Sequence, residues 1–520
     1  MSTNKTPYYI TTAIAYANGA PHLGHAYEAI ITDVMARFKR LDGFDTYFLT
    51  GMDEHGQKVV RTAEKEGISP QEMADQIADV FLQNTKTFNI SQDQFIRTTE
   101  ERHHKASQAL WQKLEDNGDI YLDKYDGWYS VRDEAFYAED ELVKDEATGT
   151  KLSPQGTEVE WVEEESYFFK LSAYEDKLLE YYENNPDFIA PQSRKNEIIS
   201  FVKGGLLDLS ISRTTFDWGV KAPNDQKHVM YVWLDALTNY LTAVGYPDLN
   251  DEMYKKFWPA NAHVVGKDII RFHCVYWPAF LMAANLPLPK QVFAHGFINI
   301  DGQKMSKSLG NVIAPQDLID RYGVDQTRYL LMRSISHGED GNYAHDQALL
   351  RINADLANGL GNLAQRALSM VFKNCEGALP AHDNLTQDDN ALLTQAYSTI
   401  DAVKPFAEKF QFNRALEEVW KLVSAANTYV DEQAPWGLKK TDPERMGVVL
   451  SVIAETVRCL GILIQPVMPQ SADKLLSQLK VPDDKRQFMH LSAEFALEEG
   501  TTIDKPEGVF PRITENEEAA

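Results

Sequence analysis

The chain has 520 residues, 43% of them hydrophobic and 25% charged, which is enough for about two to four domains of an ordinary globular protein. Its 51 Lys and Arg residues against 77 Asp and Glu residues give a net charge of −26, which argues against a protein that coats nucleic acid without selectivity. A nucleic-acid partner must therefore meet local basic patches, and charge alone favours an enzyme of small molecules.

No uninterrupted run of about eighteen apolar residues marks a membrane span, and the N-terminus resembles neither a signal peptide nor a transit peptide. We therefore expect a cytoplasmic protein that does not enter a membrane. The cysteines, Cys274, Cys375 and Cys459, form no CxxC pair, so we expect reduced thiols and neither a disulfide framework nor a zinc knuckle.

The N-terminal segment predicts a strand, a helix and a second strand. Residues 8–16 (YYITTAIAY) are β-branched and aromatic, a helical pattern begins at His22 and closes on Gly43, and residues 45–53 (DTYFLTGMD) form the next strand. A βαβ unit of this spacing implies a parallel sheet, with a ligand site at the carboxyl ends of its strands.

The pattern changes twice further along the chain. Residues 120–170 are rich in short aromatic strands and polar turns, which indicates an inserted domain, and the α/β pattern resumes from residue 231. Strands disappear after about residue 345. Amphipathic or apolar helices are predicted there over 354–372, 412–433 and 446–468, and they favour a helical bundle.

The sequence HLGH (22–25) stands where the first strand gives way to the helix. A helix N-terminus carries unpaired N–H groups and partial positive charge that suit a triphosphate, and His22 and His25 lie on one face. Gly24 leaves room for a nucleotide close to the backbone. An isolated HxxH is more often a helix cap or a metal site, so this segment alone does not decide the function.

A second segment, GQKMSKSLGN (302–311), places Lys304 and Lys307 in a loop rich in glycine and serine. Such lysines can neutralise charge on a leaving pyrophosphate, and a mobile loop can close over ATP, although a lone KxSKS is usually a solvated basic loop. HLGH and KMSKS together resemble the paired signatures of class I aminoacyl-tRNA synthetases, and the resemblance covers nearly the whole chain.

Several further segments resemble the methionyl-tRNA synthetase family. AIAYANG (13–19) is similar to its Ala-Leu-Pro-Tyr-Ala-Asn-Gly, with Ala15 in place of the usual proline, and VWLDA (232–236) is followed by Leu237 where relatives often have proline. DEHG (53–56), GKDIIRFH (266–273) and Trp277-Pro278 complete the set. The resemblance implies ATP-dependent activation of L-methionine to methionyl-adenylate and its transfer to the 3′ end of tRNA(Met).

The architecture that the resemblance implies is α/β: a Rossmann-like parallel-sheet catalytic domain, split by an α+β insertion, and then an all-α anticodon-binding helical bundle. We place the catalytic halves at residues 1–117 and 229–324 and the insertion at 118–228. A connector at 325–345 leads to the bundle at 346–520.

The nucleotide site follows from the same resemblance. It makes His22, His25, Lys304 and Lys307 the catalytic residues, and magnesium is expected to accompany ATP, held mostly by phosphates and water. Arg213 resembles an arginine that helps to order the KMSKS loop. The other implied ATP-binding residues are Gly24, Gly266, Asp268, His295, Gly296, Phe297, Ile298 and Ser306.

A methionine site needs apolar walls, a polarisable contact for sulfur and an acid for the ammonium group. Aromatic rings suit a thioether at about 0.3–1.5 kcal/mol per contact. Without the resemblance, the tryptophans are more commonly core residues and Asp53 a strand-end cap. With it, Asp53 binds the ammonium group, His273 lies at the sulfur end, and the pocket is completed by Ala13, Ile14, Tyr16, Trp233, Ala236, Phe272 and Trp277.

The length of the insertion separates close relatives. The valine, isoleucine and leucine enzymes carry a much larger editing domain there, because one methylene gives only about 1–3 kcal/mol of discrimination. The cysteine enzyme would need zinc-ligand cysteines, and the insertion of this chain has no cysteine. The chain therefore resembles the zinc-free branch of the methionine family, and we expect no structural metal.

The helical region carries the tRNA signal. Asn362 and Arg366 are four apart on one helix face, and Trp436 offers a plane for base stacking, so the resemblance assigns all three to the anticodon of tRNA(Met). Two alternatives are a small-molecule nucleotidyltransferase of the same fold and a non-catalytic tRNA-binding paralogue. The helices after 345 have no role in the first, and intact HLGH and KMSKS argue against the second. We expect a monomer.

Overall fold

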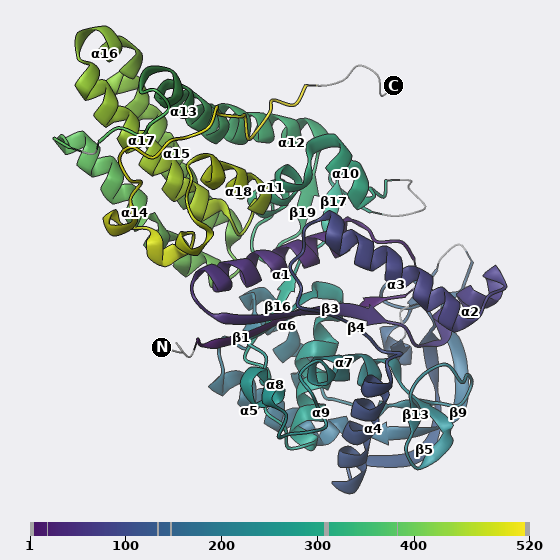
Figure 1. Cartoon of the computed structure of the whole chain (residues 1–520). Coiled ribbons are helices and arrows are strands. Elements are labelled where there is room, and N and C mark those ends of the chain that lie inside the picture. The colour runs from purple at the N-terminus through teal and green to yellow at the C-terminus, as the bar shows by residue number, and fades with distance from the viewer. Residues whose placement is uncertain are drawn as a thin grey trace.

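The computed structural model describes residues 5–514 except 18, 133–134, 146–147, 306–310 and 382. Figure 1 shows an α/β part that holds the N-terminus and a helical part built from the C-terminal third, with α1 (Leu23–Leu41) at the boundary between them. One apolar core runs from α1 into the helical part, since Ile30 and Val34 belong to the same buried cluster as Leu422 and Ile453.

The predicted βαβ unit is confirmed. β1 (Pro7–Thr12) and β3 (Asp45–Asp53) are parallel, with Pro7 opposite Asp45. α1 ends at Leu41, with Asp42 as its C-cap and Gly43 at a positive φ of 89° directly after it. The single strand expected over 8–16 is wrong in one detail. Residues 13 and 14 leave the ladder, and β2 (Ala15–Tyr16) resumes with Ala15 opposite Met52, which shifts the register by one residue.

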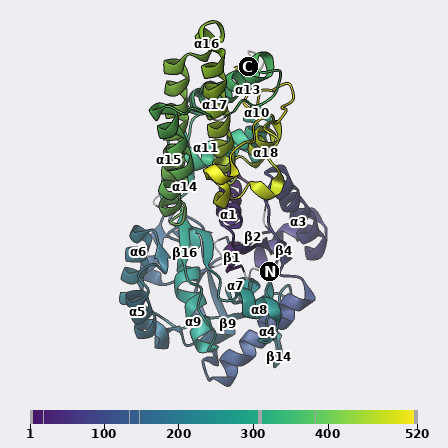
Figure 2. The ribbon, with the colours of Figure 1, turned by 60° about the vertical axis from the view of Figure 1, so that its left-hand side comes forward.

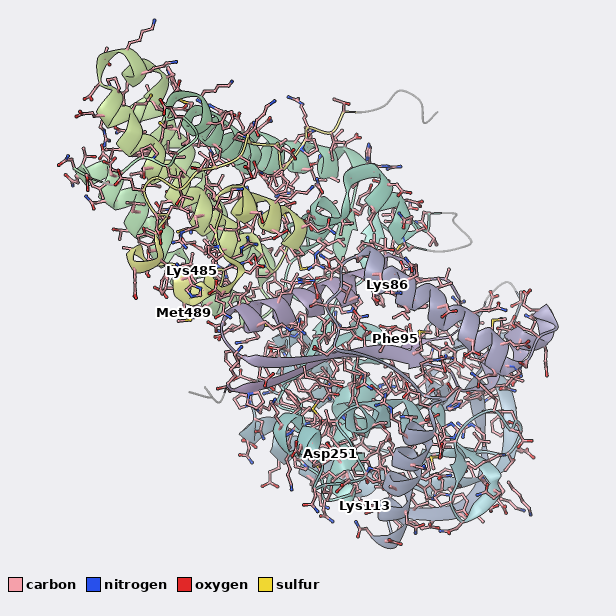
Figure 3. All side chains as sticks on the ribbon, in the orientation of Figure 1. Lys86, Phe95, Lys113, Asp251, Lys485 and Met489 are labelled. Atoms are coloured by element: carbon pink, nitrogen blue, oxygen red, sulfur yellow. The ribbon has the colours of Figure 1, made fainter. Side chains whose placement is uncertain are left out.

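The large sheet has seven strands in the order β10-β16-β15-β1-β3-β2, with β4 beside β3, and its pairs are parallel. The predicted parallel-sheet α/β architecture is thereby confirmed. In Figure 3, Lys86 of α3 and Asp251, which caps α8, lie on opposite sides of the sheet. The strands not yet bounded are β4 (Gln94–Arg97), β10 (Ile189–Ala190), β15 (Ala262–Gly266) and β16 (Val292–His295).

Helices connect these strands and cover both faces. After β3 come α2 (Gln57–Glu66), α3 (Pro70–Thr87) and, beyond β4, α4 (Glu101–Asp116). α7 (Val232–Thr242) and α8 (Glu252–Phe257) precede β15. A short 3₁₀ turn (Lys267–Ile269), a π-helical turn (Phe272–Tyr276) and α9 (Trp277–Ala283) lie between β15 and β16.

The region predicted as an insertion contains a four-stranded antiparallel sheet, β11-β9-β5-β6. Its long pair is β5 (Ile120–Ser130) with β9 (Glu160–Phe169), and the rings of Trp128 and Trp161 meet across it at 5.2 Å. The boundaries 118–228 stay a prediction, and β10 within them pairs with the large sheet. The remaining elements are β6 (Ala135–Tyr137), β7 (Val143–Lys144), β8 (Lys151–Leu152), α5 (Glu175–Asn184), α6 (Gln192–Lys203), β11 (Leu209–Ser210), β12 (Ser212–Arg213), β13 (Lys221–Ala222) and β14 (Asp225–Met230).

A small sheet joins the two parts of the molecule. β17 (Ile298–Ile300) pairs with β18 (Gln303–Lys304), which enters the KMSKS segment, and with β19 (Gly341–Tyr343) from the predicted connector. α10 (Pro315–Tyr322) and α11 (Val324–Ser334) lie between β18 and β19.

The helical part contains the three predicted helices, and the range 412–433 is confirmed to the residue as α15 (Phe412–Gln433). The range 354–372 differs, since a π-helix (Ile352–Gly361) precedes α13 (Asn362–Asn374). Figure 2 shows α14, α15 and α17 side by side, with α16 at the end of the bundle away from the sheet. The other helices are α12 (His345–Arg351), α14 (Gln387–Ala407), α16 (Pro435–Thr441), α17 (Pro443–Ile464) and α18 (Pro469–Gln478).

α17 is long and apolar enough to cross a membrane by length and composition alone. In this fold 89% of its most apolar window is buried against other helices, as expected of the central helix of a bundle.

Candidate active site

The two histidines of HLGH cap α1. The Nδ1 of His22 accepts the backbone N–H of Gly24 at 3.1 Å, and the Nδ1 of His25 accepts the backbone N–H of His22 at 3.2 Å. The rings stack at 3.8 Å, as their shared helix face predicted. Burial and the charges of His22 and His295 lower the pKa of His25 to about 3. The neutral ring therefore keeps its proton on Nε2, where it is a donor.

The helix cap has room only for a glycine at position 24. A Cβ on Gly24 would stand 2.9 Å from Cε1 of His22, which is closer than real Cβ contacts. A larger residue would push the His22 ring out of the stack with His25. The glycine thus sets the geometry of the two imidazoles.

Glu28 joins α1 to the end of β16. Its Oε2 accepts from Nε2 of His295 at 3.0 Å and its Oε1 accepts the N–H of Ala13 at 3.1 Å. Burial raises the pKa of Glu28. Burial lowers the pKa of His295, but the hydrogen bond and the charge of Glu28 outweigh it and raise the pKa. Sequence reasoning missed Glu28, although its position three residues after His25 puts it on the same helix face.

The residues assigned to adenosine lie beside this pair. Gly266 ends β15, and a Cβ there would be 2.5 Å from Oδ1 of Asp268 and 3.9 Å from Cε1 of His295. A Cβ on Gly296 would meet the carbonyl oxygen of Glu339 at 2.1 Å. Both glycines thus keep the carboxyl ends of β15 and β16 narrow, where parallel sheets bind ligands.

The ring of Phe297 contacts two lysine ammonium groups where the chain enters the KMSKS segment. Nζ of Lys267 and Nζ of Lys304 lie 4.5 Å and 5.1 Å from its ring centroid, and Lys267 also binds Asp340 at 2.7 Å. The next residue, Ile298, is buried in β17. Lys304 on β18 is therefore held against the ring of Phe297, which stands two residues after His295 in the chain. Ser306 and Lys307 lie outside the described residues, so their predicted roles are not tested.

An aromatic cluster lies on the other side of the large sheet from α1. Trp233 and Phe272 stack at 3.7 Å, and Nδ1 of His273 donates to the carbonyl oxygen of Ile269 at 3.0 Å. Its Nε2 therefore accepts the hydroxyl of Tyr240 at 2.7 Å, and burial lowers the pKa of His273 to about 4. A neutral histidine among rings suits an uncharged, polarisable group.

Trp277 and Tyr240 are two further members of this cluster. Trp277 is fully buried, 6.1 Å from the Tyr240 ring, and so forms the back of the cluster. Tyr240 was not predicted. Its spacing from Trp233 and Ala236 on α7, seven and four residues, was the available signal, because these positions share a helix face.

The remaining predicted pocket residues come from β1, β2 and β3. Tyr16 stands opposite Asp53 in the sheet, and Asp53 is 7% exposed at the end of β3. Ala13 and Ile14 are half-buried against the cluster that contains Tyr240 and Trp277. Ala13, Ile14 and Tyr16 thus pack against the same apolar cluster as Trp233 and Trp277, and Asp53 is placed next to this group by its pairing with Tyr16. Assignment of these residues to one amino-acid pocket stays a prediction.

Arg213 is buried between two tyrosine rings. Its guanidinium carbon lies 5.3 Å from the centroid of Tyr129 and 4.7 Å from that of Tyr231, and Nη1 donates to Oγ of Ser210 at 2.9 Å. These contacts connect the predicted insertion to the residue before α7. The predicted effect on the KMSKS loop concerns residues outside the described ranges.

Two of the three residues assigned to tRNA are in contact, and the third lies one helical turn away. The guanidinium carbon of Arg366 on α13 lies 5.1 Å from the ring centroid of Trp436 on α16, and Trp436 is 49% exposed. Asn362 begins α13 and is exposed one helical turn from Arg366. An exposed cation, amide and indole on one surface can contact an unstacked base.

Within the described residues, no group of three or more His, Cys, Asp or Glu side chains could hold a metal ion. Cys274 and Cys459 are buried thiols, and burial raises the pKa of each.

The chain matches two families. Residues 8–368 match the family described as "tRNA synthetases class I (M)", and residues 379–520 match the "Anticodon binding domain of methionyl tRNA ligase". Among curated relatives, the methionine–tRNA ligase of Brucella suis is 59% identical over 515 residues, covering 99% of each chain. That of Rhizobium meliloti is 58% identical over 507 residues, covering 98% of each.

Solved structures agree with these matches. The structure of Mycobacterium tuberculosis methionyl-tRNA synthetase in complex with methionyl-adenylate has a TM-score of 0.95 at 52% identity, covering 98% of this chain and 100% of that one. The apo form of that protein has a TM-score of 0.90 at 49% identity, covering 99% and 100%. Both halves of the sequence and the complete fold lead to one assignment: the chain belongs to the methionyl-tRNA ligase family of class I tRNA synthetases.

Proposed function

We propose that the site performs the two reactions of a methionine–tRNA ligase through the residues described above. In the first, the methionine carboxylate attacks the α-phosphate of ATP and pyrophosphate leaves. In the second, a ribose hydroxyl at the 3′ end of tRNA(Met) attacks the carbonyl carbon of the adenylate and AMP leaves. Neither reaction needs a covalent enzyme intermediate, so the protein contributes positioning and electrostatic stabilisation.

The observation that carries this proposal is the capped histidine pair on α1. Because the Nδ1 atoms of His22 and His25 accept backbone N–H groups, the Nε2–H groups are the donors for phosphate oxygens. Lys304, with Lys307 in the KMSKS segment, neutralises the charge of the leaving pyrophosphate. Gly24, Gly266, Asp268 and the segment 295–298 take the adenosine side, with Ser306 in the loop and Arg213 behind it.

The amino acid occupies the aromatic cluster. Asp53 binds its ammonium group, Trp233, Phe272 and Trp277 surround the side chain, and neutral His273 faces the sulfur. Ala13, Ile14, Tyr16 and Ala236 complete the walls.

Magnesium enters with ATP and is held by phosphates and water, since the described residues offer no group of three metal ligands. Residues 118–228 contain no cysteine, which supports an insertion that folds without zinc. Asn362, Arg366 and Trp436 bind the anticodon. A cytoplasmic monomer with domain boundaries at 117, 228, 324 and 345 completes the proposal, and sedimentation analysis tests the monomer.

Methionine-dependent exchange of pyrophosphate into ATP tests the proposal directly. The wild-type chain should catalyse exchange with methionine, and subsequently charge tRNA(Met). The Lys307→Ala variant should exchange at least about a hundredfold more slowly with nearly unchanged methionine affinity, because the lysine acts on the leaving group. Absence of exchange by the wild-type chain with methionine would refute the assignment.

A further inference from the structure

His55 and Asp235 lie in two segments that resemble the family, but neither belongs to the proposed nucleotide or methionine site. His55 follows Asp53 in DEHG, and Asp235 follows Trp233 in VWLDA. These two side chains meet in the fold: Nδ1 of His55 lies 2.6 Å from Oδ2 of Asp235. The other oxygen, Oδ1, lies 2.7 Å from Nε2 of His103 on α4.

The carboxylate is completely buried, and both oxygens face imidazole rings. Burial raises the pKa of Asp235, but the charge of His55 and hydrogen bonds from both rings prevail and hold the pKa below its ordinary value. An ionised carboxylate only accepts hydrogen bonds, so each ring donates the N–H that faces it. Charge-assisted bonds of this kind are stronger than neutral ones.

The segment after β3 is anchored on its other sides as well. The backbone N–H of Glu54 donates to Oγ1 of Thr98 at 2.9 Å, and the Glu54 carbonyl accepts from the indole of Trp218 at 2.6 Å. Nε of Arg97 binds the Glu54 carboxylate at 2.6 Å. These bonds fix the segment to β4 and to the insertion, whereas the His55–Asp235 bond fixes it to α7.

The His55–Asp235 bond lies two residues along the chain from a predicted pocket residue on each side. Asp53 is the last residue of β3 and stands two residues before His55, which lies in the segment after that strand. Trp233 stands two residues before Asp235 on α7, and Ala236 comes immediately after Asp235. The ammonium partner and the side-chain pocket thus belong to separate elements, and the His55–Asp235 bond joins the segment that follows Asp53 to the helix that carries Trp233.

We propose that Asp235 and His55 are positioning residues that set the place of the Asp53 carboxylate relative to the side-chain pocket on α7. Together they make recognition of the amino-acid ammonium group depend on one buried hydrogen bond. The inference rests on the proposed function, which assigns Asp53 to that group.

The test compares two variants at position 55 against two methionine analogues. His55→Ala removes the donor, while His55→Asn keeps an N–H near the place of Nδ1. Methioninol retains the ammonium group and lacks the carboxylate, and 4-(methylthio)butanoate retains the carboxylate and lacks the ammonium group. Each is measured as a competitive inhibitor against methionine in pyrophosphate exchange.

His55→Ala should raise the inhibition constant of methioninol and the KM for methionine about tenfold. The inhibition constant of 4-(methylthio)butanoate and the KM for ATP should stay within about twofold, and His55→Asn should restore most of the loss. His104→Ala is the matched control, because its ring packs edge-on against His55 at 5.3 Å, whereas the ring hydrogen bonds described for Asp235 come from His55 and His103. It should leave the ratio of the two inhibition constants unchanged.

Equal losses for both analogues, or an equal effect of His104→Ala, would overturn the inference and leave the proposed function standing. A wild-type chain without methionine-dependent exchange would overturn both. If His55→Ala does not fold, Asp235→Asn gives the same test, since an amide offers one acceptor oxygen to two ring donors. Asp235→Asn should likewise weaken methioninol more than 4-(methylthio)butanoate, and equal losses for the two analogues would again overturn the inference.

Discussion

In each of the stacked imidazoles at the start of α1, Nδ1 is occupied by a backbone N–H, so Nε2 is the nitrogen proposed to contact phosphate. His25 uses Nδ1 to cap the helix, and its low pKa of about 3 leaves it neutral at physiological pH. His25→Ala should slow pyrophosphate exchange roughly a hundredfold, because one preorganised donor is lost. His25→Gln places an amide near Nε2 and should recover part of that rate, which single-turnover measurement of adenylate formation checks. Equal rates for the two variants would contradict a donor role for Nε2.

Trp436 belongs to the opposite end of the molecule, where Arg366 lies against its ring. Trp436→Ala should weaken kcat/KM for charging of tRNA(Met) by roughly tenfold to a hundredfold, the cost of one lost base stack. Pyrophosphate exchange without tRNA should be unchanged, because α16 lies at the far end of the bundle. Equal losses in tRNA charging and in pyrophosphate exchange would show that Trp436 does not act by contacting the anticodon.

Sequence reasoning at the residue scale found groups whose chemistry is visible in their own type and neighbours. Two histidines at helical spacing and two lysines in a glycine-rich loop are of this kind. It missed Glu28 and Tyr240, and it gave no role to Asp235. Their importance lies in buried hydrogen bonds to residues far away in the chain, and those partners exist only once the chain has folded.

Three helices of the bundle meet at Asp389. It caps α14, accepts the hydroxyl of Tyr429 on α15, and binds Arg445 on α17, with Nη2 at 2.8 Å. Burial raises the pKa of Asp389, but the hydrogen bonds from Arg445 and Tyr429 outweigh it and hold the pKa below its ordinary value. The bonds therefore stabilise the fold fully above the unfolded-state pKa of about 4, and this stabilisation is lost as the pH falls from there through the lower folded-state pKa.

Asp389→Asn should therefore lower the free energy of unfolding by about 2 kcal/mol at neutral pH. Denaturation of the wild type and the variant across pH 7 to about 3 checks this, and the difference should shrink at the acidic end. A constant difference at every pH would show that the charge of Asp389 contributes nothing.

Elements with a strong internal pattern were predicted closely, such as α1, β3 and α15. Their apolar residues recur at one period and their ends carry caps or turns. The break between β1 and β2 was not predicted, because it depends on the register with β3 and on the bond from Ala13 to Val264 of β15. The π-helix over Ile352–Gly361 was missed for a similar reason, since its periodicity is close to that of an α-helix.

At the scale of the whole molecule, Arg328 on α11 joins three regions. It is completely buried and donates to Oδ2 of Asp33 on α1 at 2.6 Å, to the carbonyl of Phe88 at 3.1 Å, and to the carbonyl of Val467 after α17 at 2.8 Å. A buried ion pair with one partner removed costs about 3–5 kcal/mol. Arg328→Met should therefore destabilise the chain by that amount and separate the melting of the α/β part from that of the bundle in calorimetry.

Arg333→Gln is the matched control for this variant. Arg333 lies on the same helix and binds Glu417 of α15 at 3.0 Å, but 48% of the Glu417 side chain is exposed to solvent. An exposed pair is worth less than about 1 kcal/mol, so the variant should melt as one transition near the wild-type temperature. A similar change in both variants would mean that Arg328 has no special part in joining the domains.

The assembly of the domains was only partly open to sequence reasoning. Changes in composition marked the insertion and the bundle, and the α/β class followed from the first βαβ unit. The contacts of Arg328 and the pairing of β10 with β16 were not foreseen, because neither segment carries a local pattern that points to its partner.

The position of β1 inside the large sheet affects how the chain folds during its synthesis. β1 lies between β3 and β15, and Tyr9 binds Asn261, which is 252 positions later. At about 5–20 residues per second, the ribosome needs roughly 12–50 seconds to supply that second neighbour. During this interval the nascent chain exposes one apolar strand edge, so a chaperone that shields it should raise the yield of native protein, and truncation before residue 262 should yield aggregates.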